Sequence, residues 1–227
     1  MEKFSWPNPP NPTVFPIASP AYPLIFGGAF ITVIFALLGM KISALVSLLA
    51  TAAVCGFFRD PDRVTPVENG AVIAPADGKV IVVQIEEENP YIPGPCLKIS
   101  IFMTVFNVHV NRIPHEGEVV GIDYRPGKFY SADKNDATMK NEQNAVMVQT
   151  KQNQLYAVVQ VAGFVARRII CTLQPGKTVG RGQRFGMICF GSRLDIYLPP
   201  NTESKVTKGQ KTRAGTTILG YLNETEK

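Results

Sequence analysis

The stretch that decides the fold is FGMICFGSRLDIYLP, residues 185–199. On both sides of its Gly191-Ser192 step the residues are aromatic, β-branched or alternating in polarity, which predicts two strands or one kinked strand. Glycine inside a strand usually marks a bulge or a close backbone approach, because it adopts dihedral angles that other residues avoid. Such a kink would present the Ser192 hydroxyl. The pattern also fits a plain surface hairpin turn, so the rest of the chain has to separate the two readings.

The composition points to one unusually apolar part of the chain. Of the 227 residues, 18% are charged and 45% hydrophobic, against roughly 25% charged in an ordinary soluble domain. In residues 1–58 the only charged side chains are Glu2, Lys3 and Lys41. The formal net charge of +5 suits an anionic membrane surface. No basic run with interleaved aromatic residues indicates nucleic acid, so we expect no nucleic-acid partner.

The cysteine pattern favours reduced thiols. The four cysteines are widely spaced, form no C-x-x-C pair and accompany only two histidines. A zinc site is therefore not expected, and neither is a disulfide framework in a chain of this length. We predict a cytoplasmic setting and no bound metal.

The N-terminal part predicts a membrane attachment. Residues 1–23 are rich in proline, which excludes helix and central strand and indicates a tether. Residues 24–40 and 42–58 are apolar stretches of 17 residues each, separated by Lys41, and a helix of that length rises about 25 Å. Two thin spans and a re-entrant hairpin both remain open, and buried helices of a soluble protein are the alternative. Arg59 follows directly, which predicts that the chain leaves the hairpin on the cytoplasmic side.

Residues 59–227 have an all-β character. Residues 71–83 alone contain two β-type runs around an Asp-Gly turn signal, and many similar short runs follow. A V-x-x-G-Q pattern occurs at 179–183 and again at 206–210. These hairpins resemble the barrel-sandwich hybrid fold of lipoyl and biotinyl carrier domains. We therefore expect a mainly β, barrel-sandwich-hybrid-like domain preceded by a hydrophobic helical hairpin at 24–58.

Four motifs in a fixed order suggest a family. They are PADG at 75–78, NVHVNRIP at 107–114, NEQN at 141–144 and FGSR at 190–193. Each is weak alone, but together they resemble the short form of the phosphatidylserine decarboxylases. The resemblance extends from the apolar hairpin to the C-terminus.

The resemblance implies a proenzyme that cleaves itself between Gly191 and Ser192. The serine hydroxyl attacks the preceding carbonyl of a strained peptide, and elimination then leaves a pyruvoyl group, the covalent cofactor, at position 192. His109 is the implied base, and Asp77 is the implied residue that fixes its tautomer. The products would be a β chain, residues 1–191, and an α chain, residues 192–227.

The implied reaction takes place on a lipid. The pyruvoyl group at position 192 forms a Schiff base with phosphatidylserine, accepts electrons as carbon dioxide leaves, and yields phosphatidylethanolamine. The implied partners are phosphatidylserine in the cell membrane and the paired α and β chains, as one heterodimer or a higher oligomer. The catalytic domain is expected on the cytoplasmic face. Whether the lipid carries acyl or isoprenoid chains is left open.

Two positions depart from the long-form pattern of the family. Arg193 replaces a threonine, and its side chain would face a substrate phosphate or carboxylate. Arg112 stands where a second histidine is usual, which leaves His115 as a second candidate base beside His109.

Two other function classes compete with the decarboxylase. A non-catalytic, membrane-tethered barrel-sandwich adaptor would explain the anchor and the β pattern, but it gives Ser192, His109 and Asp77 no role. A membrane serine hydrolase needs a G-x-S-x-G elbow and an oxyanion hole, and neither is evident.

Overall fold

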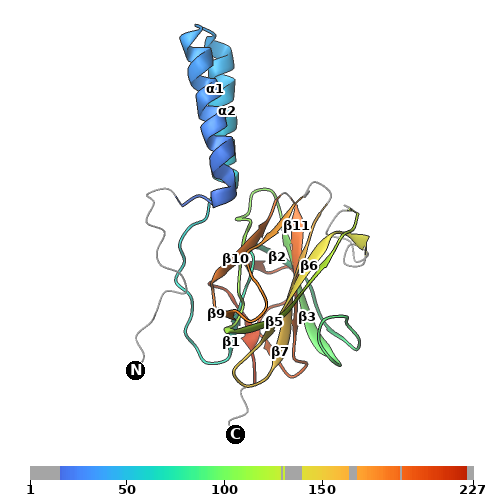
Figure 1. The fold of residues 1–227 in the computed structure, drawn as a ribbon. Coiled ribbons are helices and arrows are strands. Elements are labelled where there is room, and N and C mark those ends of the chain that lie inside the picture. Colours follow the sequence, from blue (N-terminus) through green and yellow to red (C-terminus); the bar gives the residue numbers. More distant parts are fainter. Residues whose placement is uncertain (1–15, 129, 131–139, 164–167, 190, 224–227) are drawn as a thin grey trace. The chain divides into compact units, whose positions relative to one another are not determined.

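The computed structural model describes residues 16–128, 130, 140–163, 168–189 and 191–223 (Figure 1). The chain divides into two compact units, a helical unit of residues 11–62 and a β unit that contains residues 63–227. Most of the predicted tether, residues 1–15, lies outside the described residues.

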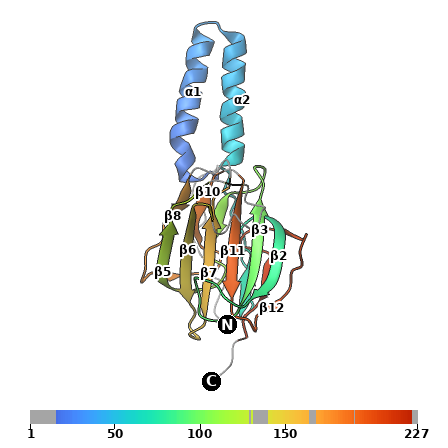
Figure 2. The ribbon, with the colours of Figure 1, turned by 90° about the vertical axis from the view of Figure 1, so that its right-hand side faces the viewer.

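The helical unit is an antiparallel pair of helices, seen in Figure 2. A short 3-10 turn, Ser19–Ala21, leads into α1 (Tyr22–Leu37), and α2 (Lys41–Phe57) follows a tight turn. Gly39 makes this turn possible because its φ of 72° is one that glycine tolerates well. Gly28 allows the close approach of the helices, since a Cβ there would lie 2.4 Å from Thr51 Oγ1.

The outer surface of this helical pair is apolar. Neither helix contains a buried residue, although almost every side chain is hydrophobic. Residues Ser19–Leu37 form one segment of 19 residues that contains an 18-residue window with a mean hydropathy of 1.8, and by length and composition it could cross a membrane. Helix α2 has 17 residues; it is also apolar but is shorter than this 19-residue segment.

The β unit contains fourteen described strands. They are β1 (Ala71–Ile73), β2 (Gly78–Glu86), β3 (Cys96–Met103), β4 (Val110–Arg112), β5 (Gly117–Arg125), β6 (Gln143–Gln149), β7 (Leu155–Val161), β8 (Ile169–Cys171), β9 (Thr178–Val179), β10 (Arg184–Ile188), β11 (Ser192–Leu198), β12 (Glu203–Ser204), β13 (Lys211–Thr212) and β14 (Ile218–Tyr221).

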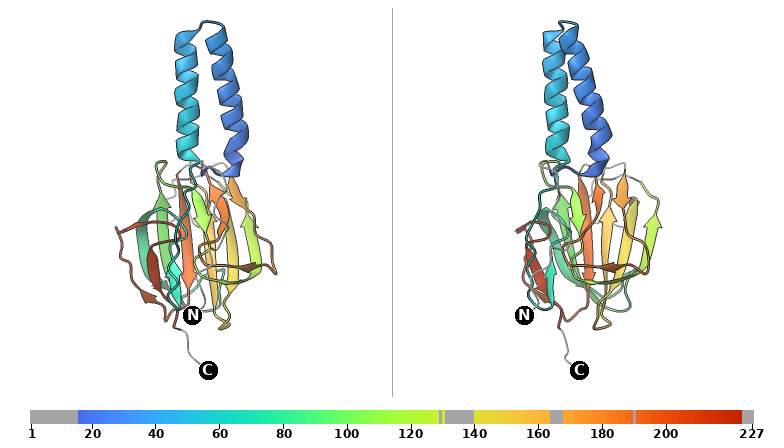
Figure 3. Two further views of the ribbon diagram at one scale, coloured as in Figure 1. Left: turned by 90° about the vertical axis from the view of Figure 1, so that its left-hand side faces the viewer. Right: turned by 60° about the vertical axis from the view of Figure 1, so that its left-hand side comes forward.

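These strands form one large sheet and two small ones, visible in Figure 3. The large sheet has the order β13-β2-β3-β11-β7-β6-β5-β9 and curls into a half-barrel. The small sheets have the orders β4-β10-β8 and β1-β14-β12. The prediction of a mainly β domain preceded by apolar helices is therefore confirmed.

The core lies between the large sheet and the small ones. Alternation along β11 sends Leu194, Ile196 and Leu198 into this core, where they join residues of β1, β10 and β14. Tyr197 belongs to a separate apolar cluster on the opposite face of the same strand. Residues 185–199 are thus two strands in two different sheets, and Gly191 lies where the chain passes from one sheet to the other.

Candidate active site

Gly191 and Ser192 form the start of the central strand β11. Gly191 has a φ of 49°, in the left-handed region that favours glycine. Ser192 is fully buried, and its Oγ has no hydrogen-bond partner among the described residues. Buried hydroxyl groups are nearly always hydrogen-bonded, so such a group calls for an explanation. The preceding motif residue, Phe190, lies outside the described residues.

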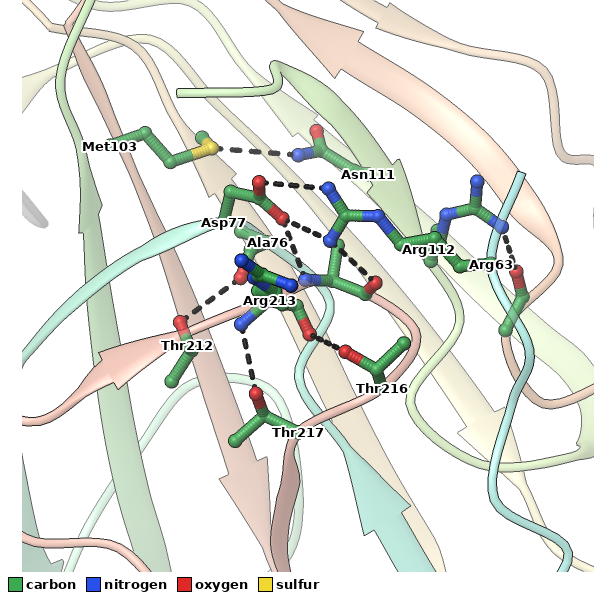
Figure 4. Close-up of polar contacts among 12 residues, drawn as sticks. Arg63, Ala76, Asp77, Met103, Asn111, Arg112, Thr212, Arg213, Thr216 and Thr217 are labelled. Atoms are coloured by element: carbon green, nitrogen blue, oxygen red, sulfur yellow. Dashed lines mark hydrogen bonds and ion pairs between the residues drawn. The ribbon is translucent and has the colours of Figure 1, made fainter. Parts of the chain in front are cut away.

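Met103, the last residue of β3, is the point at which the predicted site segments converge. It lies opposite Ser192 in the β11–β3 register. On the other side of β3, Lys79 pairs with Phe102, so the start of β2 reaches the same end of the sheet. Asn111 of β4 donates a hydrogen bond to Met103 Sδ at 3.8 Å, as Figure 4 shows.

His109 belongs to the segment that leads into β4. It is fully buried and comes directly before β4, where Val110 pairs with Met187 of the antiparallel strand β10. Asn111, two residues after His109, contacts Met103, which pairs with Ser192. The segment that carries His109 therefore reaches the end of the large sheet at which β11 begins.

Asp77 is held by three hydrogen bonds (Figure 4). Arg63 Nη1 donates to Oδ1 at 2.6 Å, and Arg63 Nη2 donates to Oδ2 at 2.9 Å. The backbone N–H of Ala214 donates to Oδ1 at 2.8 Å. Within the described residues, the contacts of Asp77 include none from His109, so its predicted role as the partner of that histidine stays a prediction.

The glycine after Asp77 is required by the sheet. A Cβ at Gly78 would lie 2.2 Å from the Phe102 carbonyl oxygen, which is closer than atoms can pack. The Asp-Gly pair therefore has a physical reason beyond the turn: the aspartate supplies the carboxylate, and the glycine lets β2 approach β3.

A buried chain of side-chain amides links the strands that carry these residues. Asn144 of β6 donates to Gln160 of β7 at 3.0 Å, and Gln160 donates to Asn111 of β4 at 2.9 Å. All three side chains are buried, so each hydrogen bond forms without competition from water. In the sequence, Asn144 stands out only as part of the NEQN motif, and Gln160 does not stand out because a lone glutamine in a strand carries no signal.

Comparison with known proteins agrees with this arrangement. The family model for phosphatidylserine decarboxylase matches residues 50–220 of the 227. The chain belongs to the phosphatidylserine decarboxylase family. Proteins named phosphatidylserine decarboxylase proenzyme from Desulfotalea psychrophila and Geotalea uraniireducens are 48% and 49% identical to it over 207 residues, which cover 91% of this chain and 97% of each relative. A relative with the same name from Geobacter metallireducens is 47% identical over 212 residues.

This membership confirms the family resemblance and the enzyme class. The chain is a decarboxylase, which removes the reason for a non-catalytic adaptor. The motifs at 75–78 and 107–114 both lie within the residues that match the family model. The structure brings both to the same end of the β unit as Ser192.

The second histidine of this decarboxylase lies elsewhere. His115 is buried rather than solvated, its Nδ1 is 2.9 Å from the Glu116 carbonyl oxygen, and the Tyr156 hydroxyl donates to its backbone oxygen. Tyr156 comes near the start of β7, whereas Val161 at its end pairs with Arg193. Five residues of strand span about 16 Å, so the structure does not bring His115 to Ser192.

Arg193 points away from the side of the sheet that Ser192 occupies. Consecutive residues of a strand face opposite sides, and Arg193 is buried in an ion pair with Asp195, with Nε 2.8 Å from Oδ1. On that face Arg193 is one of the residues that line a cavity, so its predicted contact with a substrate phosphate or carboxylate stays a prediction. Arg112, in the place of the second family histidine, is also buried and donates to the Gly182 carbonyl at 3.1 Å.

A cavity of about 710 Å³ lies on the Arg193 side of the sheet. Its lining includes Tyr91, Lys98, Gln143 and Tyr197. Burial raises the pKa of Tyr91 to about 12, so this hydroxyl stays protonated and donates to Gln143 at 3.0 Å. The cavity is separated from Ser192 by the sheet itself, and we assign it no part in the site.

Proposed function

We propose that this chain is a membrane-attached proenzyme that cleaves itself between Gly191 and Ser192 and then converts phosphatidylserine to phosphatidylethanolamine and carbon dioxide. The observation that carries the proposal is the buried Ser192 hydroxyl, which has no hydrogen-bond partner among the described residues and follows a glycine with positive φ. A hydroxyl without a stabilising contact, next to a glycine whose carbonyl is unhindered, is suited to attack that peptide.

The cleavage uses groups of the chain itself. Ser192 Oγ bonds to the Gly191 carbonyl carbon, its proton passes to His109, and the peptide C–N bond breaks as the nitrogen takes a proton. The resulting ester is then eliminated: the Ser192 α-proton is removed, and residues 1–191 leave with a carboxylate on Gly191. Hydrolysis of the dehydrated residue releases ammonia and leaves the keto group at position 192. A histidine is suited to these transfers because it takes and gives protons near neutral pH.

Asp77 assists His109 in this proposal. A carboxylate offers about four acceptor positions; Oδ1 accepts two hydrogen bonds and Oδ2 accepts one, from Arg63. The remaining position on Oδ2 would receive an N–H of His109, which would fix the tautomer of the ring and stabilise its charged form.

The residues around position 192 fit a pyruvoyl group. Such a group supplies a ketone that condenses with the substrate amine and accepts the electron pair left by carbon dioxide. Ser192 starts a strand of seven buried residues, so its surroundings exclude water. A Cβ at Gly191 would meet no described atom within 4 Å, which leaves space beside the bond to be cleaved. His109 would return the proton to carbon after decarboxylation.

The two chains would stay together after cleavage. Residues 192–227 include β11, which is hydrogen-bonded to β3 on one side and β7 on the other. They also include β13, which pairs with β2, and β14, which pairs with β1. Because all these pairings join the α chain to the β chain, we expect an α/β heterodimer that unfolds as one body.

The apolar helices would attach the enzyme to the membrane in which its substrate resides. Their exposed hydrophobic surface supports this, and Arg59 at the exit of α2 favours the cytoplasmic face. Sodium carbonate extraction of cell membranes should leave the β chain, residues 1–191, which carries the helices, in the pellet. Aspartate in place of Leu37 and Ile42, which are 82% and 81% exposed, should release it, whereas aspartate in place of Val64 and Val67 in the β unit should not. Release of the unaltered chain by carbonate would contradict the attachment.

Mass spectrometry of the purified protein tests the central claim. We expect a fragment of residues 192–227 with a hydroxylamine-reactive carbonyl at its start, and production of phosphatidylethanolamine from vesicles containing phosphatidylserine. Ser192→Ala should remain one chain and be inactive. Ser204→Ala, in β12 of the same α chain, is the matched control and should be cleaved normally. An intact, fully active chain would overturn the proposal.

A further inference from the structure

Arg63 is the one side chain that grips both oxygens of Asp77 in the described residues. We propose that Arg63 is a positioning residue for self-cleavage: it sets the orientation of Asp77 and joins that carboxylate to the chain that cleavage creates. The inference rests on the proposed function, because it concerns how Asp77 is presented to His109. In the sequence, the basic residues after the helices indicate only the side of the membrane on which the chain leaves them.

The contacts form a closed ring. Arg63 Nη1 donates to Asp77 Oδ1 at 2.6 Å and to the Ala214 carbonyl oxygen at 3.1 Å, while the Ala214 N–H donates to the same Oδ1 at 2.8 Å. Arg63 Nη2 completes the grip on Oδ2 at 2.9 Å. The side chains of Arg63 and Asp77 are only 12% and 13% exposed, so the ion pair is poorly screened by solvent and well ordered.

The three donors leave one acceptor position on Oδ2 of Asp77. Two donors occupy the acceptor positions of Oδ1, and one donor occupies Oδ2, so the carboxylate cannot rotate without breaking both bonds to the guanidinium. Only a planar fork can hold both oxygens at once, and the ammonium of lysine acts as a single point. Arg63 therefore determines where the last acceptor position of Asp77 points.

The residues of the ring lie on both sides of the Gly191–Ser192 bond in the sequence. Arg63 and Asp77 precede Gly191, whereas Ala214 lies in the 192–227 segment. In the cleaved enzyme the ring would join the β chain to the α chain next to the site. Arg63 also follows the end of α2 at Phe57 by only six residues, so the segment that leaves the apolar helices ends in this contact.

The test compares the rate of self-cleavage of full-length variants in cell-free synthesis, followed by the appearance of the 192–227 fragment. Arg63→Gln should slow cleavage on the order of 100-fold, since misplacing a catalytic group by about 1 Å has that effect. Arg63→Lys should recover part of the rate. Arg63→Ala should be accelerated by added guanidinium at millimolar concentration, which supplies the planar set of donors that the variant lacks. Arg213→Gln removes an exposed charge beside Ala214 and should cleave normally.

The outcomes separate this inference from the proposed function. If the unaltered chain is never cleaved, the proposed function fails. If the unaltered chain is cleaved and Arg63→Gln cleaves equally fast, the positioning role is overturned and the proposed function stands. Thermal unfolding of Arg63→Gln in a Ser192→Ala background completes the test: loss of cooperative unfolding, together with no rescue by guanidinium, would assign Arg63 to stability alone and overturn the inference.

Discussion

Ser192 lies directly opposite Met103 in the antiparallel pairing of β11 with β3. Since Asn111 of β4 contacts the Met103 sulfur, this pair ties the strand that begins with the serine to the segment that carries His109. The end of β3 is therefore where the strand that begins with Ser192 and the segment that carries His109 meet.

The positive φ of Gly191 should matter for cleavage more than for folding. A methyl group there meets no described atom within 4 Å, but the backbone angle costs an alanine about 1–2 kcal/mol. We expect Gly191→Ala to fold and to cleave more slowly, and Gly191→Asn to be faster than alanine because asparagine tolerates this region.

The rate of appearance of the 192–227 fragment measures this effect. Gly56→Ala in helix α2 is the control, since its added methyl also meets nothing within 4 Å but carries no positive φ. Equal rates for all three variants and the unaltered chain would show that this backbone angle plays no part.

The buried amide chain should support the site through Gln160. Gln160→Leu keeps the side-chain volume nearly constant. It removes the hydrogen-bond partner of the side-chain oxygen of Asn111 and that of the side-chain N–H of Asn144. We expect the free energy of unfolding to fall by about 2–4 kcal/mol, measured by urea in a Ser192→Ala background, and cleavage in the unaltered background to slow. Gln149→Leu, at an exposed position of β6, should change neither. A neutral Gln160→Leu would rule out the amide chain as a support.

The Arg193–Asp195 ion pair should be structural. Both side chains are at most 1% exposed, so Asp195→Asn leaves a buried charge and should lower the free energy of unfolding by about 3–5 kcal/mol. Replacing both residues by leucine should cost less than the single change. Asp123→Asn breaks the exposed pair with Arg125 and should cost less than about 1 kcal/mol. A double variant that folds well but binds substrate more weakly would instead show that Arg193 takes part in substrate binding.

Glu116 should contribute stability only above acidic pH. Burial opposes its ionisation, but hydrogen bonds from Arg181 at 2.8 Å and 2.9 Å outweigh this and hold the pKa below its usual range. A carboxyl whose pKa is lowered by folding stabilises the protein above its unfolded pKa, and this contribution is lost as pH falls through the folded pKa.

Urea unfolding of Glu116→Gln at several pH values checks this. The variant should be slightly less stable than the unaltered chain at pH 7, and the two should converge under acid conditions. Arg181→Gln should show the same pH-dependent loss. A constant difference across pH would mean that the ion pair is not its source.

Local features of the chain were readable from the sequence. The apolar helices follow from two long hydrophobic stretches, and the β unit follows from short β-branched runs separated by glycine, proline and Asp-Gly. The helix ends differ from the predicted ones by one to three residues. A proline lies in the first turn of α1 and Gly39 lies in the turn between the helices, and these residues locate the helix ends better than hydrophobicity does. The four ordered motifs were enough to indicate the family, which the comparisons confirm.

The contacts of the site were not readable in the same way. Asp77 was predicted to face His109, but nothing in the sequence connects it with Arg63 or with Ala214, more than a hundred residues away. The side of the sheet that Arg193 occupies depends on the register of β11, and a shift of one residue would reverse it. His115 and His109 are six positions apart, yet His115 contacts Tyr156 near the start of β7, whereas the segment that carries His109 contacts Met103 through Asn111.

By itself the sequence determined the apolar helices, the β architecture and the Gly191-Ser192 step, because these depend on hydrophobicity, propensity and chain flexibility within short segments. Only the tertiary structure decided which groups meet there. Strand order and register are set by burying one common core, so they alone bring Ser192 beside Met103, close the ring of Arg63, Asp77 and Ala214, and turn Arg193 to the opposite face.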